Sequence, residues 1–289
     1  MKWPLHDDPG AFGGLPERPV PDRCRFAVLP IPYDGTSTWR KGADRGPDAL
    51  LAASANMELY DIETGGEPWR AGIVTMAPVL HDGPPEGMVA KVRAAADDLL
   101  DRGLTVVGLG GEHSVSIGLI QAHAARFPGL TVLQFDAHGD TRDSYEGSPN
   151  NHACVMARAA EVADYVQVGI RSLDAAEAPK VRPDRTFYAH EIGDGYDFIP
   201  AVVDRLSGPV YVTIDLDVFD PGIMPSTGTP EPGGLAYRQV VRTLAAVAQR
   251  HRIVGFDVVE LLPDPRNPGP DFLAARLAYQ LMAYLTARQ

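Results

Sequence analysis

Cysteine is scarce in this sequence, and long apolar runs are missing. The two cysteines, Cys24 and Cys154, lie far apart and form no Cys-x-x-Cys pattern, so we expect neither a disulfide scaffold nor a thiolate zinc site. No stretch reaches the roughly 18 apolar residues that a membrane helix needs. The segment MKWPLHDDPG at the start contains no apolar run that would serve as a signal peptide. We therefore expect a cytoplasmic protein without a membrane partner.

Basic residues are outnumbered by acidic ones. The chain has 26 Lys and Arg against 38 Asp and Glu, which gives a formal net charge of −12. Nucleic acids and anionic membranes attract clusters of Lys and Arg, so this balance argues against either partner. It favours a small cationic ligand instead.

The sequence also lacks internal repeats, low-complexity segments and a clear linker. Residues 1–24 are rich in Pro, Gly and charge and are predicted to form an N-terminal arm. Residues 25–289 are predicted to form a single domain, because 289 residues with 45% apolar composition suffice for one large core.

Short apolar or β-branched runs alternate with amphipathic stretches after the arm. Such runs are typical of strands buried on both faces, and they span residues 25–31, 104–110, 130–136, 164–170, 209–217 and 252–259. Helical spacing is found at 86–103, 115–127, 197–208, 235–251 and 271–287, and Gly103 is placed as the residue that follows a helix. This alternation predicts an α/β fold with right-handed crossovers and a mainly parallel sheet.

Sites in such sheets form beyond the carboxyl ends of the strands, and three of the predicted strands lead there to potential metal ligands. The residues are Glu112 and His113 after 104–110, Asp136, His138 and Asp140 after 130–136, and Asp215 and Asp217 at the end of 209–217. Side chains at i, i+2 and i+4 of an extended segment point the same way. Unpaired carboxylates buried at such a place are costly, and bound cations would remove that cost.

A lone Asp after a strand is usually a turn or cap residue, but three such strand ends together favour a metal site. Four Asp and two His exceed the needs of one ion, so some carboxylates should bridge two. Oxygen-rich donors with imidazoles and no thiolate suit Mn²⁺ better than structural zinc. Two ions about 3.5–4 Å apart can generate a hydroxide at neutral pH, and we therefore predict metal-assisted hydrolysis.

The three motifs GGEHS, DAHGD and TIDLDVFDP resemble the metal-binding motifs of the ureohydrolase family, which contains arginases and agmatinases. The likeness continues in LPIPYDGTSTWRKGADRGPDAL (29–50), STGTPEPGG (226–234) and FDVVELLPDP (256–265). It covers roughly residues 25–285. The resemblance implies a three-layer αβα sandwich around the sheet, the arginase-like fold, which makes 25–289 the catalytic domain, and assembly as homo-trimers or homo-hexamers.

The resemblance also implies a binuclear manganese centre that releases urea from a guanidino compound. A metal-bridging hydroxide would attack the guanidinium carbon, and Asp140 would hydrogen-bond this hydroxide and help to pass on its proton. The implied ligands of one Mn²⁺ are His113, Asp136, Asp140 and Asp215, and those of the other are Asp136, His138, Asp215 and Asp217, with Asp136 and Asp215 bridging.

Three further residues take roles from the resemblance. His152 matches a mobile-loop histidine that shuttles a proton, a task for which an ordinary pKa near ~6.5 is suited. Glu260 matches a glutamate that grips the guanidinium, and Thr229 matches a threonine beside the metals on the substrate side. Gly139 departs from the family pattern, in which Ala or Thr usually precedes the last Asp of this motif, and its effect on the pocket is left open.

The substrate is less closely defined than the chemistry. PYDGTSTWRKGADRGP, MELYD and DTRDSYEGSPNNHACVMARA resemble the agmatinase branch, which favours agmatine or aminopropylagmatine. The spacing of Ser148, Asn150 and His152 resembles groups with which arginases receive the α-carboxylate of arginine, so arginine and guanidinobutyrate stay as alternatives. A phosphatase, a single-zinc deacetylase of related fold and a catalytically silent metal-binding relative are weaker readings, because no ligand of either metal is missing.

Overall fold

The computed structural model describes residues 2–8, 11–15 and 20–287. Within these ranges no helix has the length and apolar character needed to cross a membrane. The division into an arm over 1–24 and one domain over 25–289 stays a prediction, and residues 1, 9–10, 16–19 and 288–289 of it lie outside the described part.

One sheet of eight strands runs through the described chain, and every strand pair in it is parallel. Its order is β2-β1-β3-β8-β7-β4-β5-β6. The strands are β1 (Phe26–Ile31), β2 (Ile73–Thr75), β3 (Thr105–Gly110), β4 (Thr131–Phe135), β5 (Asp164–Ile170), β6 (Thr186–Tyr188), β7 (Pro209–Asp215) and β8 (Arg252–Val259). All six predicted strands are therefore confirmed within two residues at their ends, and β2 and β6 were not predicted.

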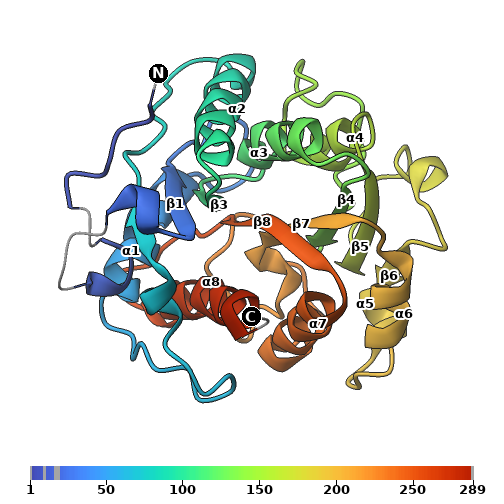
Figure 1. Cartoon of the computed structure of the whole chain (residues 1–289). Coiled ribbons are helices and arrows are strands. Elements are labelled where there is room, and N and C mark those ends of the chain that lie inside the picture. Colours follow the sequence, from blue (N-terminus) through green and yellow to red (C-terminus); the bar gives the residue numbers. More distant parts are fainter. Residues whose placement is uncertain (1, 9–10, 16–19, 288–289) are drawn as a thin grey trace.

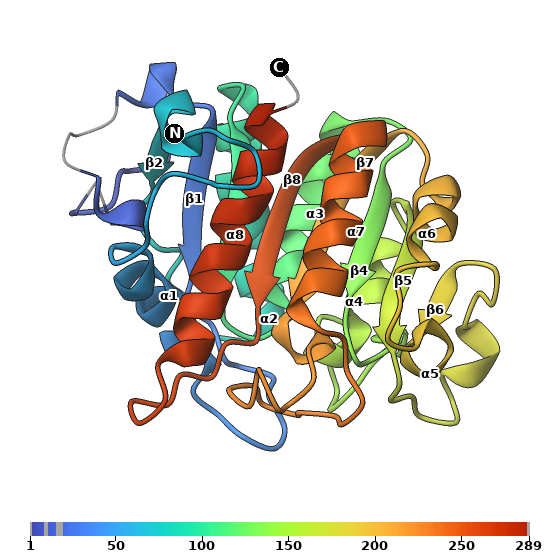
Figure 2. The same cartoon turned by 90° about the horizontal axis from the view of Figure 1, so that it is seen from below.

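Helices cover both faces of the sheet (Figure 1). On one face lie α1 (Gly46–Ser54), α6 (Ile199–Arg205), α7 (Tyr237–Arg250) and α8 (Gly269–Ala287). On the other lie α2 (Pro85–Asp101), α3 (Val115–Arg126) and α4 (Val155–Ala159), while the four-residue α5 (Ala189–Ile192) follows β6. Figure 2, turned by 90°, shows the sheet between the two helical layers. The predicted three-layer α/β architecture is confirmed.

Alternating side chains of each strand build two separate cores. Phe26 and Val28 of β1 belong to the core under α1, α7 and α8, whereas Ala27 and Leu29 belong to the core under α2 and α3. Because both faces of the strand are buried, its sequence reads as a continuous apolar run. Gly103 follows α2 with a φ of 77° and confirms its predicted place as the glycine after the helix.

Candidate active site

The predicted ligands follow the strands in the middle of the sheet. Because β3, β8, β7 and β4 are neighbours and all parallel, their carboxyl ends meet at one edge. β3 leads to His113, β8 to Glu260, β7 to Asp215 and Asp217, and β4 to Asp136, His138 and Asp140.

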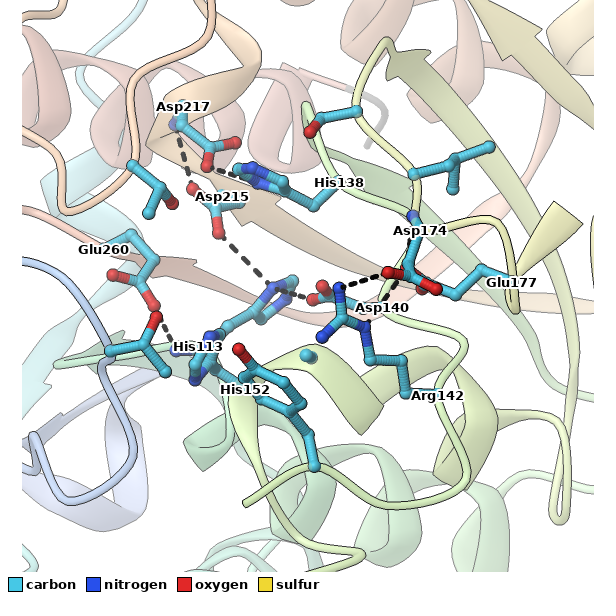
Figure 3. A pocket seen from close by; sticks show the side chains of 16 residues that line it. His113, His138, Asp140, Arg142, His152, Asp174, Glu177, Asp215, Asp217 and Glu260 are labelled. Atoms are coloured by element: carbon cyan, nitrogen blue, oxygen red, sulfur yellow. Dashed lines mark hydrogen bonds and ion pairs between the residues drawn. The ribbon is translucent and has the colours of Figure 1, made fainter.

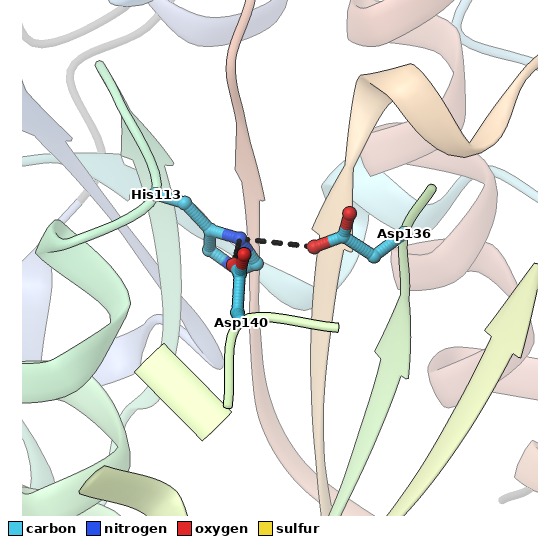
Figure 4. Close-up of side chains that lie close together, drawn as sticks. All are labelled: His113, Asp136 and Asp140. Atoms are coloured by element: carbon cyan, nitrogen blue, oxygen red, sulfur yellow. Dashed lines mark ion pairs between the residues drawn. The ribbon is translucent and has the colours of Figure 1, made fainter. Parts of the chain in front are cut away.

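His113 lies at the centre of a first group of ligands. Its Nδ1 atom is 2.9 Å from Asp140 Oδ2, 3.1 Å from Asp136 Oδ2 and 3.4 Å from Asp215 Oδ2. Figure 4 shows the carboxylates of Asp136 and Asp140 directed at this imidazole. His113, Asp136 and Asp140 are buried, and one ligand atom of each lies within 4.8 Å of the others.

A second group shares Asp136 with the first. His138 Nδ1 is 2.9 Å from Asp217 Oδ2 and 3.6 Å from Asp136 Oδ1, so the two oxygens of Asp136 face different imidazoles. Asp215 stands between them, because its Oδ1 accepts the backbone N–H of Asp217 while its Oδ2 faces His113. The structure thus gathers all six predicted ligands, and each group could hold a metal ion.

Thr213 on β7 orients the imidazole of His113. His113 Nε2 lies 2.9 Å from Thr213 Oγ1, and this hydroxyl gives its own hydrogen to Asp257 Oδ1 at 2.7 Å. Nε2 must therefore carry the hydrogen of this contact, which leaves Nδ1, on the side of the carboxylates, as the nitrogen that could bind a metal ion. Tyr211 also donates to Asp257, at 2.6 Å. None of these three was predicted, although positions 211, 213 and 215 share one face of an extended strand.

The predicted ligands are buried close together, and burial and their neighbours' charges shift their pKa values. Burial, followed by the negative charge of Asp136, raises the pKa of Asp140 to about 7. Burial also raises the pKa of Asp215 well above its usual value, and Asp217 adds to this. For His113, burial lowers the pKa, but Asp136 and Asp140 outweigh it and raise the pKa well above its usual value. So much buried carboxylate is costly unless cations neutralise it.

The donor chemistry of the two groups fits divalent metal ions. Among the described residues, His113 Nδ1 is a buried nitrogen without a hydrogen-bond partner, although three carboxylate oxygens surround it. A cation would satisfy this nitrogen and the carboxylates together. Carboxylate and imidazole ligands without thiolate suit Mn²⁺ and related ions.

A cavity of about 300 Å³ opens over these residues (Figure 3). Arg142 is the one Lys or Arg among its described lining residues. The guanidinium is engaged, because its Nε is 3.3 Å from buried Glu177 Oε2, its Nη2 is 3.9 Å from Asp174 Oδ2, and it lies over the ring of Tyr145. These four residues were not predicted, and their contacts join two loops that are distant in sequence.

Glu260 and Thr229 both line the cavity. Glu260 Oε1 accepts the backbone N–H of His113 at 2.8 Å, which leaves Oε2 for other donors. Burial and the negative charge of Glu112 raise the pKa of Glu260 well above its usual value. Glu260 and Asp140 have φ values of 67° and 53°, and such strained non-glycine backbone gathers at functional sites.

His152 begins a single 3-10 turn, His152–Cys154, and reaches the same cavity. Its backbone N–H donates to Thr36 Oγ1 at 3.0 Å, and its Nδ1 is 3.1 Å from that oxygen. Burial, helped by positive charge on His113 and His138, lowers the pKa of His152 to about 4. The prediction of an ordinary pKa is therefore wrong, because the folded chain removes water from the ring and spacing does not reveal that.

Ser148 and Asn150 share the loop of His152 but do not line the cavity. The hydroxyl of Ser148 donates to Glu86 Oε1 at 2.5 Å. The side chain of Asn150 also hydrogen-bonds this carboxylate. Their arginase-like spacing therefore does not bring them to the cavity wall.

A comparison with protein families shows to which family the chain belongs. The model of the arginase family matches residues 24–284. The chain belongs to the arginase family. N(1)-aminopropylagmatine ureohydrolase from Synechocystis sp. is 38% identical over 268 residues, which cover 89% of this chain and 88% of that protein. The predicted family and enzyme class, a ureohydrolase, are confirmed.

Two solved structures of this family's fold resemble the chain closely. The agmatine ureohydrolase of Thermoplasma volcanium gives a TM-score of 0.84 at 31% identity and covers 93% of this chain and 92% of its own. The proclavaminate amidino hydrolase from Streptomyces clavuligerus gives a TM-score of 0.87 at 27% identity and covers 99% of both chains. The arginase-like fold is therefore confirmed, while the named substrates of these relatives differ.

Proposed function

We propose that this protein hydrolyses a small guanidino compound with a cationic tail, agmatine or aminopropylagmatine, to urea and putrescine or spermidine. Water adds to the guanidinium carbon, the bond from that carbon to the alkyl-substituted nitrogen breaks, and the amine leaves with a proton from the water. Relatives named aminopropylagmatine ureohydrolase and agmatine ureohydrolase support this choice.

The proposal of a cationic tail rests on the charged side chains that line the cavity. Apart from the proposed metal ligands, its described lining residues include Asp174, Glu177 and Glu260 but a single Arg, and Arg142 already contacts Glu177 and Asp174. A substrate carboxylate would find no unpaired cation on this wall, whereas an ammonium group would meet Asp174, whose side chain is 52% exposed. An unpaired buried charge is costly, so the wall favours an amine tail over a carboxylate tail.

Two Mn²⁺ ions per subunit would complete the centre. One would be held by His113, Asp136, Asp140 and Asp215, and the other by Asp136, His138, Asp215 and Asp217. The division of Asp136 between two imidazoles supports a bridging role for it. When bound, such ions generate hydroxide at neutral pH and polarise the substrate.

The remaining roles belong to side chains that face the cavity. Glu260 Oε2 would accept N–H groups of the guanidinium, a strong charge-assisted contact, and Thr229 would offer a hydroxyl on the same side. Asp140 would accept a hydrogen bond from the attacking water and help to pass on its proton. His152 is neutral at pH 7 and, with Nδ1 beside Thr36, would use Nε2 to pass a proton between the leaving amine and solvent.

A urea-release assay tests this proposal. The manganese-loaded protein is compared with Asp140→Asn on agmatine, aminopropylagmatine, arginine, guanidinobutyrate and guanidinopropionate. We expect release from the first two and a loss of at least about 100-fold in kcat for Asp140→Asn. Preference for arginine would overturn the substrate class, and no urea from any compound would favour a silent metal-binding relative.

The family resemblance also supports a proposal for the location, the assembly and the metabolic role of the enzyme. We propose a cytoplasmic homo-oligomer, a trimer or hexamer, that acts in polyamine biosynthesis. Light scattering on the purified protein would test the assembly, and a monomeric mass would contradict it.

A further inference from the structure

One residue that does not line the cavity joins the two segments that carry His138 and Asp217. Arg171 follows β5, and its backbone N–H donates to Ala137 O at 2.8 Å, next to His138. Its side chain reaches the other segment, where Nη2 donates to the carbonyl oxygen of Asp217 at 2.6 Å. Because β4 lies between β5 and β7 in the sheet, the side chain of Arg171 crosses the end of β4 to reach the segment after β7.

Backbone carbonyls surround the guanidinium of Arg171. Within the described chain, each of its hydrogen bonds goes to a carbonyl oxygen and none to a carboxylate, and the acceptors are Gly169, Asp217, Val218, Phe219 and Glu231. Three of these acceptors belong to the consecutive residues 217–219, in and after the 3-10 turn Leu216–Val218 that presents Asp217. A guanidinium holds its five N–H groups in a rigid planar fork, so this side chain fixes the position of the turn.

We propose that Arg171 is a positioning residue for the metal centre, which holds the turn of Asp217 so that this carboxylate faces His138. The inference rests on the proposed function, because it requires the binuclear centre. Asp217 Oδ1 accepts the backbone N–H of Ala137 at 2.9 Å, and its Oδ2 lies 2.9 Å from His138 Nδ1 (Figure 3). Since Arg171 binds the backbone of both segments, it determines how these two ligands stand to each other.

The charge of Arg171 and its positioning role predict opposite results when the residue is changed. Burial lowers the pKa of Arg171, and the negative charges of Asp217 and Asp136 counteract this shift, so its positive charge acts on the predicted ligands. A positive charge at this place repels a metal ion, and its removal alone would tighten metal binding. Loss of the hydrogen bonds to the turn would weaken metal binding instead. Lysine keeps the charge but has no planar fork, and it therefore separates the two effects.

Manganese titration of the metal-free protein tests this role. Calorimetry is carried out on the wild type, Arg171→Lys and Arg171→Gln. We expect one of the two Mn²⁺ ions to bind about 10–100-fold more weakly in both variants, while the ion held by His113 and Asp140 changes much less. At equal manganese concentration, electron paramagnetic resonance should show isolated Mn²⁺ in the variants where the wild type shows an exchange-coupled pair.

Arg25→Lys supplies the matched control. Arg25 precedes β1, at the amino end of the sheet and so opposite the site, and its Nη2 also donates to a backbone carbonyl, Leu285 O, at 2.8 Å. This variant should lower the free energy of unfolding in urea denaturation. Both of its Mn²⁺ affinities should equal those of the wild type.

Two outcomes would overturn the inference while the wild type binds two ions. Tighter manganese binding in Arg171→Gln with unchanged binding in Arg171→Lys would show that the charge of Arg171 dominates. Unchanged or equally weakened binding of both ions would show that Arg171 has no particular role for Asp217. A wild type that binds two ions but releases no urea would refute the proposed function and leave the comparison of the variants decisive. A wild type that binds fewer than two ions would refute both.

Discussion

At the scale of single residues, the hydroxyl of Thr213 accepts a hydrogen from Nε2 of His113 and so leaves Nδ1 available to a metal ion. Thr213→Val keeps the shape of the side chain but leaves His113 Nε2 and one oxygen of buried Asp257 without their partner. We expect Mn²⁺ affinity to fall about 10–100-fold. The unfolding free energy of the metal-free protein should fall by about 1–3 kcal/mol. Manganese titration calorimetry and urea denaturation measure the two effects.

Thr131 supplies the matched control for this change. It is buried near the amino end of β4, away from the site, and donates to Ser207 O at 2.7 Å. Thr131→Val should lose comparable stability yet bind Mn²⁺ as tightly as the wild type. Unchanged affinity in Thr213→Val would show that the hydroxyl does not orient the ligand.

The ligands could be predicted from sequence because their spacing is local. Asp136, His138 and Asp140 alternate along one segment, and period-two spacing places them on one side whatever packs above. The environment of a residue could not be predicted in this way. The lowered pKa of His152 and the hydrogen bond between Thr213 and Asp257 arise from chain segments distant in sequence.

At the scale of elements, the segment after β4 packs against the segment after β5 through Gly139. A Cβ at this position would lie 2.2 Å from Leu173 Cδ2, the mobile end of a side chain that lines the cavity. Gly139→Ala should therefore move Leu173 and change KM several-fold, at a cost of about 1–3 kcal/mol in stability. Mn²⁺ affinity should change less than twofold, because Gly139 bears no ligand atom. Steady-state kinetics and manganese titration check this.

The double variant Gly139→Ala/Leu173→Ala separates this contact from a change in backbone freedom. Shortening Leu173 removes the clash, so the stability losses of the two changes should not add. Strictly additive losses would mean that the two segments do not interact through this pair. The glycine that departs from the family pattern would then act through its flexibility.

Among the elements themselves, periodicity predicted those that are long or fully buried. The missed strands, β2 and β6, have three residues each, too few for a period-two pattern to be distinguished from a loop. Three helices, α1, α4 and α5, were also missed. Of these, α1 begins with Gly46 and Pro47 and follows a loop rich in turn residues. A Gly-Pro pair usually indicates a turn or loop between elements, although Pro is favoured in the first helical turn.

At the scale of the whole molecule, the site depends on the order of the strands in the sheet, which differs from their order along the chain. The neighbours β3, β8, β7 and β4 come from four well-separated parts of the sequence. Alternation of strands and helices predicted a parallel sheet, and the motif resemblance supplied the architecture. The hydrogen bond between Glu86 and Ser148, from parts of the chain distant in sequence, also follows only from the assembled fold.

The stability of the whole molecule should also depend on pH through His123, a buried residue of α3. Its Nδ1 hydrogen-bonds Leu119 O at 2.7 Å, its Nε2 is without a partner among the described residues, and burial lowers its pKa to about 4. Between pH 6.5 and 4 the unfolded chain binds a proton here and the folded chain does not. The stability present above pH 6.5 is therefore lost as pH falls, by up to about 1.4 kcal/mol per unit.

His123→Phe keeps an aromatic ring beside Tyr211, 4.5 Å away, and removes the titration. In urea denaturation of metal-free proteins, the variant should gain roughly 2 kcal/mol on the wild type between pH 6.5 and 4.5. Parallel curves for the wild type and His123→Phe would show that His123 takes up its proton in the folded state and does not contribute to acid unfolding.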